Sequence, residues 1–369
     1  MKKLLLPIIC LLVVSIPAGA QWPRKDDSYD RKWNLQERER SAHGKETGSG
    51  GDVIRYPTDS MSVGKGFSNG LAKVTVDGKA GYIGRDGRLV IKPRFDDAGR
   101  FSEGLAPVEV AGKWGYINKR GETVIPLKFD WALRFYEGRA LVLVGEKWGY
   151  IDPQGKMVIE PQFEEAGSFS EGLARVVIYD KDFKWGFIDK VGKYRWGFID
   201  REGKWALKPA YDSPVEDFNG GRARVSKDIG MNNGVVIDIF FIDKEGRSYP
   251  EPEADERFED FEDLSPFSEG LATFRKDYKE GFVNQSGKVV IAPRFDFAGY
   301  FSEGLAPVNI KRGESYDGGW GYINARGETV IKSKFDWAWE FSEGRALVAM
   351  GDRVGYVDRA GRYIWEPSK

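Results

Sequence analysis

Phe101 to Arg134 reads FSEGLAPVEVAGKWGYINKRGETVIPLKFDWALR, and relatives of this stretch fill most of the chain. The first four copies begin 34 residues apart, and the later intervals are 49, 49, 34 and 40 residues. Self-similarity at such a period is typical of a repeat array, so we interpret the 369-residue chain as one array rather than two ordinary domains. The opening hexamer, F-x-x-G-[LR]-A, occurs eight times, at Phe67, Phe101, Phe135, Phe169, Phe218, Phe267, Phe301 and Phe341.

Three short segments recur in each unit, exemplified by Leu105–Val110, Trp114–Asn118 and Thr123–Phe129. They are rich in β-branched and aromatic residues, which favours strands. An Asx residue ends the second segment and Gly follows three residues later, as in Asn118 and Gly121. This spacing predicts a tight turn that joins the second and third segments as a hairpin. Since no helical period of comparable length is present, the sequence predicts an all-β fold.

Comparison of the units with one another separates core positions from surface positions. The Phe, Gly and Ala of the hexamer and an aromatic–aliphatic pair recur in all eight units, which a shared core requires. The Trp before the second-strand Gly varies more, with Ala80 and Glu280 in two units, so this position is predicted to be half exposed. The predicted structural residues of the unit quoted above are Phe101, Gly104, Ala106, Trp114, Gly115, Tyr116 and Gly121.

The segments KWGYIN, KWGYID and GWGYIN, together with FSEGLA and the Asx-x-x-Gly turn, resemble the WG (KWG) β-repeat family of bacterial proteins. The resemblance covers roughly residues 62–369 and rests on several linked positions that recur in order. It implies a β-rich tandem repeat and brings no catalytic residues with it. We expect eight units of about 34 residues, each with about three short antiparallel strands, arranged as a propeller-like ring or as an open β-solenoid.

The ends of the array leave this choice open. Residues 362–366 are expected to form the last unit's own third strand, which removes one obvious way of closing a ring. Val53 and Ile54 are candidates for an added strand. Two units are irregular, near 178–200 and 226–265: the second-strand motif is doubled as Trp185–Asp189 and Trp196–Asp200, and an acidic insert spans Glu251–Asp263. Insertions of this kind belong on loops, where they are either functional or neutral.

The N-terminal residues predict export. Residues 1–20 have two lysines, a short apolar run and small residues before position 21, the pattern of a secretory signal peptide; the alternative of a membrane-anchoring helix is disfavoured by the length of the run. Residues 21–52 form a polar spacer and residues 53–369 the repeat domain. The predicted location is therefore periplasmic or extracellular, with no membrane insertion after cleavage.

Composition argues against most catalytic chemistry. The single histidine, His43, lies in the spacer, and the single cysteine, Cys10, lies in the signal peptide, so no catalytic triad, metal site or cofactor is expected. A net charge of −1 with interleaved signs argues against nucleic acid as partner. The carboxylates repeated in every unit, exemplified by Glu103 and Asp130, are interpreted as structural groups that bind turn amides or a neighbouring Arg.

The residue that follows the repeated Asp differs between units: it is Asp97, Trp131, Glu165, Phe297 or Trp337. A position that accepts carboxylates faces solvent, which predicts exposed aromatics able to bind a ligand, unless each ring packs on its neighbouring unit. The candidate ligand-binding residues are Trp131, Phe297, Trp337 and Trp339.

We therefore predict a non-enzymatic exported binding or scaffold protein that recognises a protein or glycan of the cell envelope. One alternative is a carbohydrate-active hydrolase with paired carboxylates in the irregular central units. Another is a purely structural envelope protein with no discrete site.

Overall fold

The computed structural model describes residues 66–182, 193–211, 214–228, 237–250, 256–258, 261–309, 319–351 and 353–368. The chain divides into two units, Met1–Ile54 and Arg55–Lys369, and all of these residues belong to the second. The expectations for the signal peptide, the spacer, Val53 and Ile54, and the first copy of the doubled motif, Trp185–Asp189, lie outside the described residues. Among the residues described, no helix has the length and apolar character needed to cross a membrane.

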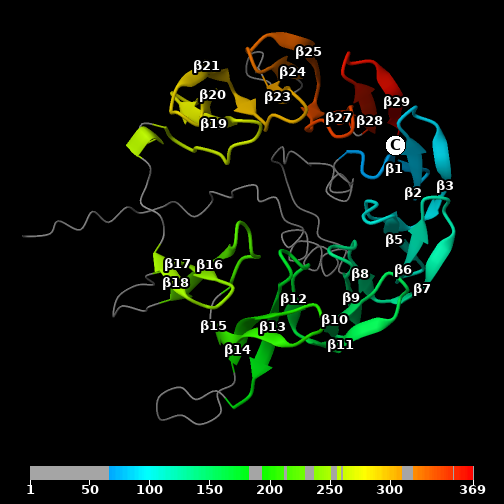
Figure 1. Ribbon diagram of the computed structural model, residues 1–369. Helices are drawn as coiled ribbons and strands as arrows, with labels where there is room; N and C mark the ends of the chain where they lie inside the picture. Colours follow the sequence, from blue (N-terminus) through cyan, green and yellow to red (C-terminus); the bar gives the residue numbers. More distant parts are fainter. Residues whose placement is uncertain are drawn as a thin grey trace, which may run out of the picture. The chain divides into compact units, whose positions relative to one another are not determined.

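The described chain forms eight small antiparallel sheets, and each contains strands that are consecutive in sequence (Figure 1). We number the units 1 to 8 in chain order. Units 1 and 2 contain β1 (Leu71–Val76), β2 (Lys79–Gly84) and β3 (Leu89–Phe95), then β4 (Asp97–Ala98), β5 (Leu105–Val110), β6 (Lys113–Asn118) and β7 (Thr123–Phe129). Units 3 and 4 contain β8 (Trp131–Ala132), β9 (Ala140–Val144), β10 (Lys147–Ile151) and β11 (Met157–Phe163), then β12 (Glu165–Ala166), β13 (Ala174–Asp180), β14 (Lys193–Ile199) and β15 (Trp205–Tyr211).

The remaining units follow the same order. Units 5 and 6 contain β16 (Arg222–Asp228), β17 (Ile237–Asp243) and β18 (Ser248–Pro250), a 3-10 helix η2 (Glu256–Phe258), then β19 (Leu271–Lys276), β20 (Lys279–Asn284) and β21 (Val289–Phe295). Units 7 and 8 contain β22 (Phe297–Ala298), β23 (Leu305–Asn309), β24 (Trp320–Asn324) and β25 (Thr329–Phe335), then β26 (Trp337–Ala338), β27 (Arg345–Met350), β28 (Arg353–Asp358) and β29 (Tyr363–Ser368).

The predicted all-β repeat fold is confirmed, and the three predicted segments of unit 2 are its strands β5, β6 and β7. A fourth strand of two residues, such as β4, was not predicted because it is too short to show a pattern in the sequence. It pairs with the strand after the hexamer, Asp97 opposite Glu109, and supplies the first edge of a four-stranded sheet. The predicted turn also holds, since Asn118 Oδ1 accepts the amides of Arg120 and Glu122.

The Gly of the W-G motif lies beneath a bulge in the next strand. In unit 2 the register jumps from Trp114 opposite Phe129 to Tyr116 opposite Ile125. The bulged backbone comes so close that a Cβ on Gly115 would be 2.5 Å from the Ile125 carbonyl oxygen. A side chain there would collide with main chain, which moves less readily than a side chain. Unit 5 carries Phe240 at this position, and its strands β17 and β18 pair in regular register.

Adjacent sheets pack face to face through a repeated core. One face of each sheet, the leading face, carries the small and branched residues after the hexamer, such as Ala106 and Val108. The opposite trailing face carries the second-strand aromatic and the third-strand aliphatic, such as Tyr116 and Ile125. The aromatic of one trailing face contacts the hexamer Phe of the next unit, with ring centroids 4.8–5.3 Å apart in Tyr82–Phe101, Tyr116–Phe135, Tyr150–Phe169, Phe198–Phe218, Phe282–Phe301, Tyr322–Phe341 and Tyr356–Phe67.

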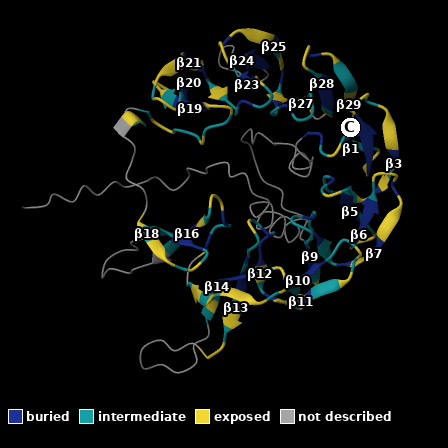
Figure 2. Ribbon diagram, viewed as in Figure 1, coloured by how far each residue is buried: buried dark blue, intermediate teal, exposed yellow. Residues whose placement is uncertain are grey.

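Burial follows from this packing. Figure 2 shows β5 and β6 largely buried, whereas the outermost strands β3 and β7 are largely exposed. One prediction was wrong for half of the units: the variable position before Gly is buried in units 1, 2, 3 and 7 and half-buried in units 4, 5, 6 and 8. Trp114 is 4% exposed, and even the Glu280 side chain is only 13% exposed. Glu280 is accommodated because Arg275 and the Ala298 amide both donate to its carboxylate.

Two hydrogen bonds recur between neighbouring units. The hexamer Ser donates to the carbonyl of the next hexamer Phe, as in Ser302 to Phe341 (2.7 Å). The hexamer Glu accepts the amide of the next hexamer Gly, as in Gly344 to Glu303 (2.8 Å). The predicted structural role of these carboxylates is therefore confirmed, including the neighbouring basic residue in units such as unit 8, where Arg359 lies 3.9 Å from Glu303.

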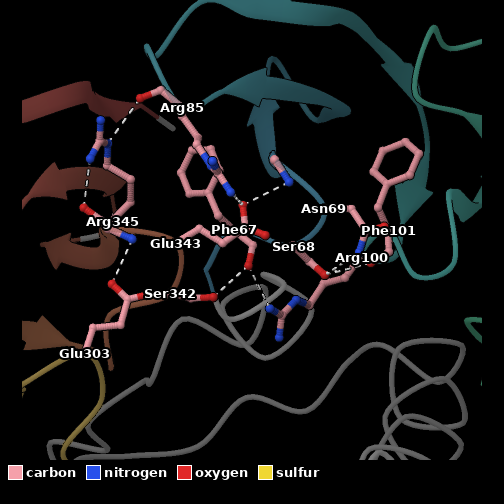
Figure 3. Close-up of polar contacts among 12 residues, drawn as sticks. Phe67, Ser68, Asn69, Arg85, Arg100, Phe101, Glu303, Ser342, Glu343 and Arg345 are labelled. Atoms are coloured by element: carbon pink, nitrogen blue, oxygen red, sulfur yellow. Dashed lines mark hydrogen bonds and ion pairs between the residues drawn. The ribbon is translucent and has the colours of Figure 1, made fainter.

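The last unit makes the same contacts with the first (Figure 3). Ser342 donates to the Phe67 carbonyl at 2.7 Å, and Glu343 accepts the Gly70 amide at 2.9 Å. Arg85 adds an ion pair to Glu343 at 2.8 Å. Units 8 and 1 are therefore neighbours, as the propeller-like alternative requires, and neither of these units is a free end of the array.

Candidate binding surface on the short first strands

Five sheets begin with a two-residue strand: β4, β8, β12, β22 and β26. Three of the candidate aromatics, Trp131, Phe297 and Trp337, begin β8, β22 and β26, whereas Trp339 follows β26. Successive strand residues point to opposite faces. The second residue is an Ala, such as Ala338, which is 3% exposed and packs in the core between units 7 and 8. The first residue of the pair consequently points to the other face of its strand, and it is this residue that varies from unit to unit.

Trp337 is the best defined of the candidates. Its side chain is 40% exposed, yet its ring lies 5.0 Å from Trp320 and 6.1 Å from Trp339, measured between centroids. Trp320 is only 7% exposed and belongs to the core between units 7 and 8. Trp337 is thus an exposed ring held against a buried one, which presents apolar surface with little orientational freedom left to lose on binding.

Phe297 occupies the equivalent position in the neighbouring unit 7 and is 52% exposed. It follows Asp296, whose carboxylate receives a bond from Lys279 at 2.8 Å. The next residue, Ala298, donates its amide to Glu280. Phe297 is therefore fixed at its backbone, while its ring faces solvent more openly than the ring of Trp337.

The other two candidates are packed more deeply. Trp131 is half-buried: it lies 4.9 Å from Trp114 and packs against the cores on both sides of unit 3. Trp339 packs into the core between units 8 and 1. The structure therefore brings Trp337 and Trp339 together, places Phe297 on the adjacent unit, and places Trp131 on unit 3. Trp131 and Trp339 match the packing alternative, and Phe297 and Trp337 match the exposed one.

Two polar side chains, Glu340 and Tyr300, lie three residues after Trp337 and Phe297 in the sequence. Glu340 follows Trp339, and its carboxylate reaches across to Gly299 of unit 7, where a Cβ would be 3.1 Å from Oε1. Burial, with a further contribution from the Glu340 charge, raises the pKa of Tyr300, which stays a neutral phenol at ordinary pH. Units 7 and 8 therefore each present an exposed first-strand aromatic, and the Glu340 carboxylate of unit 8 reaches toward unit 7.

Three exposed tyrosines were missed in the sequence. Tyr278 is 92% exposed and takes the place that Gly78 and Gly112 hold in the β-turns of units 1 and 2. Its signal was the turn itself, because a bulky residue stands where the other units use Gly. Tyr179 and Tyr194 are 49% and 57% exposed and pair at 5.2 Å on strands β13 and β14. They border the doubled motif and stand outside the alignment of the units.

The carboxylates of the irregular unit 5 are tied to structural partners. Asp243 accepts the Tyr249 hydroxyl at 2.8 Å and the Arg247 guanidinium at 2.6 Å. Burial alone would raise the pKa of Asp243, but these donors and the Arg247 amide lower it to about 2. That direction suits an ion-paired structural carboxylate rather than a general acid, whose pKa must be raised. Within the described ranges, no three acidic, His or Cys side chains are grouped as metal ligands would be.

The comparison with family models identifies the chain. The model of the WG containing repeat matches residues 81–114, 114–148, 148–181, 196–228, 260–279, 281–312 and 320–353. These matches cover more than half of the sequence, and the protein belongs to this family of β-repeat proteins. The matches are interrupted between 228 and 260, where unit 5 departs from the pattern.

Other comparisons add little. No protein of curated function matches the chain. Among solved structures, a crystal structure of the eukaryotic initiation factor is 13% identical, with a TM-score of 0.44, over 83% of this chain and 88% of the other. An acylaminoacyl peptidase from Pyrococcus horikoshii is 12% identical (TM-score 0.37; 82% and 54% covered), and Hsv2 from Kluyveromyces lactis is 8% identical (TM-score 0.30; 83% and 97% covered). Likenesses this distant carry no argument about function.

Proposed function

We propose that this WG-repeat protein is an exported, non-enzymatic binding protein, and that it recognises a protein or glycan of the cell envelope at the first strands of units 7 and 8. The observation that carries the proposal is Trp337, a 40% exposed ring supported by the buried ring of Trp320. Phe297, at the equivalent position of the preceding unit, is a second exposed ring. Aromatic side chains held in this way supply contact area at a small entropic cost, which is why they are frequent at binding sites.

The repeat architecture supports the same interpretation. The residues that are constant among the units pack in the core or form hydrogen bonds between units, so they are required for the fold. Variation from Asp97 to Trp337 at one position is what a scaffold permits where a ligand, and not the fold, selects the residue.

The test compares Phe297→Ala/Trp337→Ala with a matched control, Trp205→Ala. Trp205 is also 40% exposed but lies on β15 of unit 4. We expect the double variant to lose at least about tenfold in affinity for a native envelope fraction, because truncating an aromatic anchor commonly costs about 2 kcal/mol or more. The control should bind as the parent does, and thermal unfolding should show that all three proteins are folded.

Pretreatment of the envelope fraction identifies the ligand class. Loss of binding after protease digestion indicates a protein, and loss after periodate oxidation indicates a glycan. Equal binding by the double variant and the parent protein would refute this surface as the site.

A further inference from the structure

In the described part of the chain, neither of the two recurring hydrogen bonds joins unit 5 to unit 6. The hexamer of unit 5 reads FNGGRA, so Asn219 and Gly220 stand where Ser and Glu make the two repeated hydrogen bonds. Other junctions lack one of these residues, as with Asn69 in unit 1 and Tyr136 in unit 3, but this is the junction that lacks both. Gly220 retains the left-handed backbone of the other turns, with φ of 61°.

A segment of the insert occupies the place of unit 5 on unit 6. We call residues 256–258 and 261 the cap. The residues after it belong to unit 6 itself, because the Arg275 amide donates to the Glu262 carbonyl and the Ser265 amide to the Thr273 carbonyl, as the short first strands of other units pair with their own sheets. The leading face of unit 6, formed by Ala272, Phe274 and Val283, packs against Phe258 and Phe261 of the cap and against Leu264 of its own first segment. In unit 1 the equivalent face packs against the trailing face of unit 8.

The cap reproduces individual contacts of a neighbouring unit. The hexamer Phe267 meets Phe258 at 5.6 Å between centroids, where other hexamer rings meet a second-strand aromatic. Gly287 meets Arg257, with 3.0 Å from its ideal Cβ to the Arg257 carbonyl, whereas Gly121 meets Ile91 of the preceding sheet. Within unit 6, the segment that follows the cap is fixed by an ion pair, since Asp263 lies 3.0 Å from Arg275.

The trailing face of unit 5 is correspondingly less covered. Its second-strand aromatic, Phe241, is half-buried, while the equivalent residues of the other seven units are at most 1% exposed. Tyr249 takes the place of the third-strand aliphatic and is also half-buried. The Arg222 guanidinium lies 4.4 Å from the centre of the Tyr249 ring, so the trailing face of unit 5 is more polar than those of the other units.

We infer that the cap is a strap that holds the array open between units 5 and 6, and that the trailing face of unit 5 is a docking surface for the leading face of unit 6 in the same chain. Units 6, 7, 8, 1, 2, 3, 4 and 5 then form the packed order, and its two ends are joined by a short link. Cap and unit 5 compete for one face of unit 6, and displacing the cap closes the array.

The occupant is specified by the other interfaces. Each trailing face receives a hexamer Phe together with an Ala and a branched residue of the next sheet, as Tyr322 and Ile331 receive Phe341, Ala346 and Val348. Unit 6 carries the first two members as Phe267 and Ala272, and it has Phe274 where the other units have Val. Only five residues separate β18 from η2, so Pro250 and Glu256 are at most roughly 20 Å apart.

The test measures how accessible a thiol on the unit 5 face is. In the full chain with Cys10→Ser, a thiol is introduced by Tyr249→Cys, and by Phe241→Cys in a second variant in case the first fails to fold. The matched control is Ile125→Cys, at the position of Tyr249 in unit 2, which is 0% exposed. The rate of maleimide labelling in native buffer is divided by the rate in urea. We expect the unit 5 thiol to label at least about tenfold faster than the control thiol, because its face is open.

Closure is then restored by substitution. Asn219→Ser/Gly220→Glu supplies the missing hydrogen-bonding groups, and Phe258→Ser/Phe261→Ser weakens the cap. We expect the combined variant to slow labelling of the unit 5 thiol at least about tenfold. The control is Gly220→Ala, which adds a side chain without a carboxylate. In the cap-weakened chain it should label at the same rate as that chain without the substitution.

Three outcomes overturn the inference. The first is a unit 5 thiol that is as protected as the control thiol before the cap is weakened, which would mean that the face is already covered. The second is unchanged labelling in the combined variant, which would mean that unit 6 does not dock there. The third is protection that rises with protein concentration, which would mean that a second copy is the occupant instead of unit 6 of the same chain.

Discussion

Glutamate adopts a left-handed backbone conformation in the hexamer turn of six units, with φ between 51° and 55° at Glu103, Glu137, Glu171, Glu269, Glu303 and Glu343. With the Gly that follows, this Glu forms a two-residue turn of type I′, which requires positive φ at both central residues and usually has Gly or Asn there. The Glu side chain offsets this strain by accepting an amide from the next unit, as Glu137 does from Gly172 at 2.8 Å. One residue thus shapes the turn and joins two sheets.

Tyr278 has the same backbone strain without such a partner role in the turn. Its φ is 62° and it follows Asp277, which is also left-handed. We predict that Tyr278→Gly raises the free energy of unfolding by about 1 kcal/mol, because Gly adopts this conformation without a steric cost. Urea unfolding measures the change. The control Tyr194→Gly, within strand β14, should lower stability by about 1 kcal/mol, and a loss of stability in both variants would contradict the strain at Tyr278.

Asp243 makes stability depend on acid. Its folded pKa of about 2 lies below the value of about 3.9 expected in the unfolded chain. The carboxylate therefore stabilises the fold above about pH 4, and this contribution is lost as the pH falls from about 4 towards 2. We predict that Asp243→Asn lowers the unfolding midpoint at pH 7 and flattens the decline between pH 4 and 2. Thermal unfolding across this range checks it, and parallel curves for the two proteins would contradict it.

At the scale of strands and sheets, each unit depends on its neighbour. Ser302 donates to the Phe341 carbonyl at 2.7 Å across the junction of units 7 and 8. We predict that Ser302→Ala costs about 1 kcal/mol of unfolding free energy, because the buried carbonyl loses its donor. Ser286→Ala is the control, since that hydroxyl bonds Asn284 within an exposed turn. Chemical denaturation should show a smaller loss for the control, and equal losses would mean that the junction bond adds nothing.

Sequence reasoning reached the elements whose signal recurs. Strands β5 to β7 and the turn at Asn118 could be predicted because eight copies show the same pattern. The two-residue strand β4 could not, since its evidence is a backbone pairing with β5. The burial of Glu280 was missed because its compensation comes from Arg275 and from the Ala298 amide, neither of which can be placed beside it by reading one unit.

The candidate binding residues, too, could be predicted from the sequence only in part. The varying position was visible in the sequence, and it led to Phe297 and Trp337. Which rings face solvent depends on what the adjacent sheet supplies: Trp131 is covered by the cores on both sides, and Trp339 by the contact between units 8 and 1. That contact joins residues more than 270 positions apart, for example Ser342 and Phe67, and no local pattern indicates it.

At the scale of the molecule, the contact between units 8 and 1 decides whether each of these two units is packed against a neighbour on both faces. In a repeat array each unit is stabilised by its neighbours, so an end unit without one frays more readily. Here Phe67, Ala72 and Ile83 of unit 1 share a core with Leu347 and Tyr356 of unit 8. We therefore expect unit 8 to be as resistant to protease as the units before it.

Gly87→Ala and Gly104→Ala test this contact as a matched pair. Both glycines are left-handed, with φ of 78° and 84°, so both substitutions cost about 1 kcal/mol in strain. A Cβ on Gly104 meets nothing within 4 Å, whereas a Cβ on Gly87 would lie 1.8 Å from the Ile364 carbonyl of unit 8. We predict that Gly87→Ala loses roughly 1–3 kcal/mol more stability, in the range of overpacked sites. Limited proteolysis should also release β29 faster. If the two variants lose the same stability and are cleaved at the same rate, units 8 and 1 do not pack together in solution.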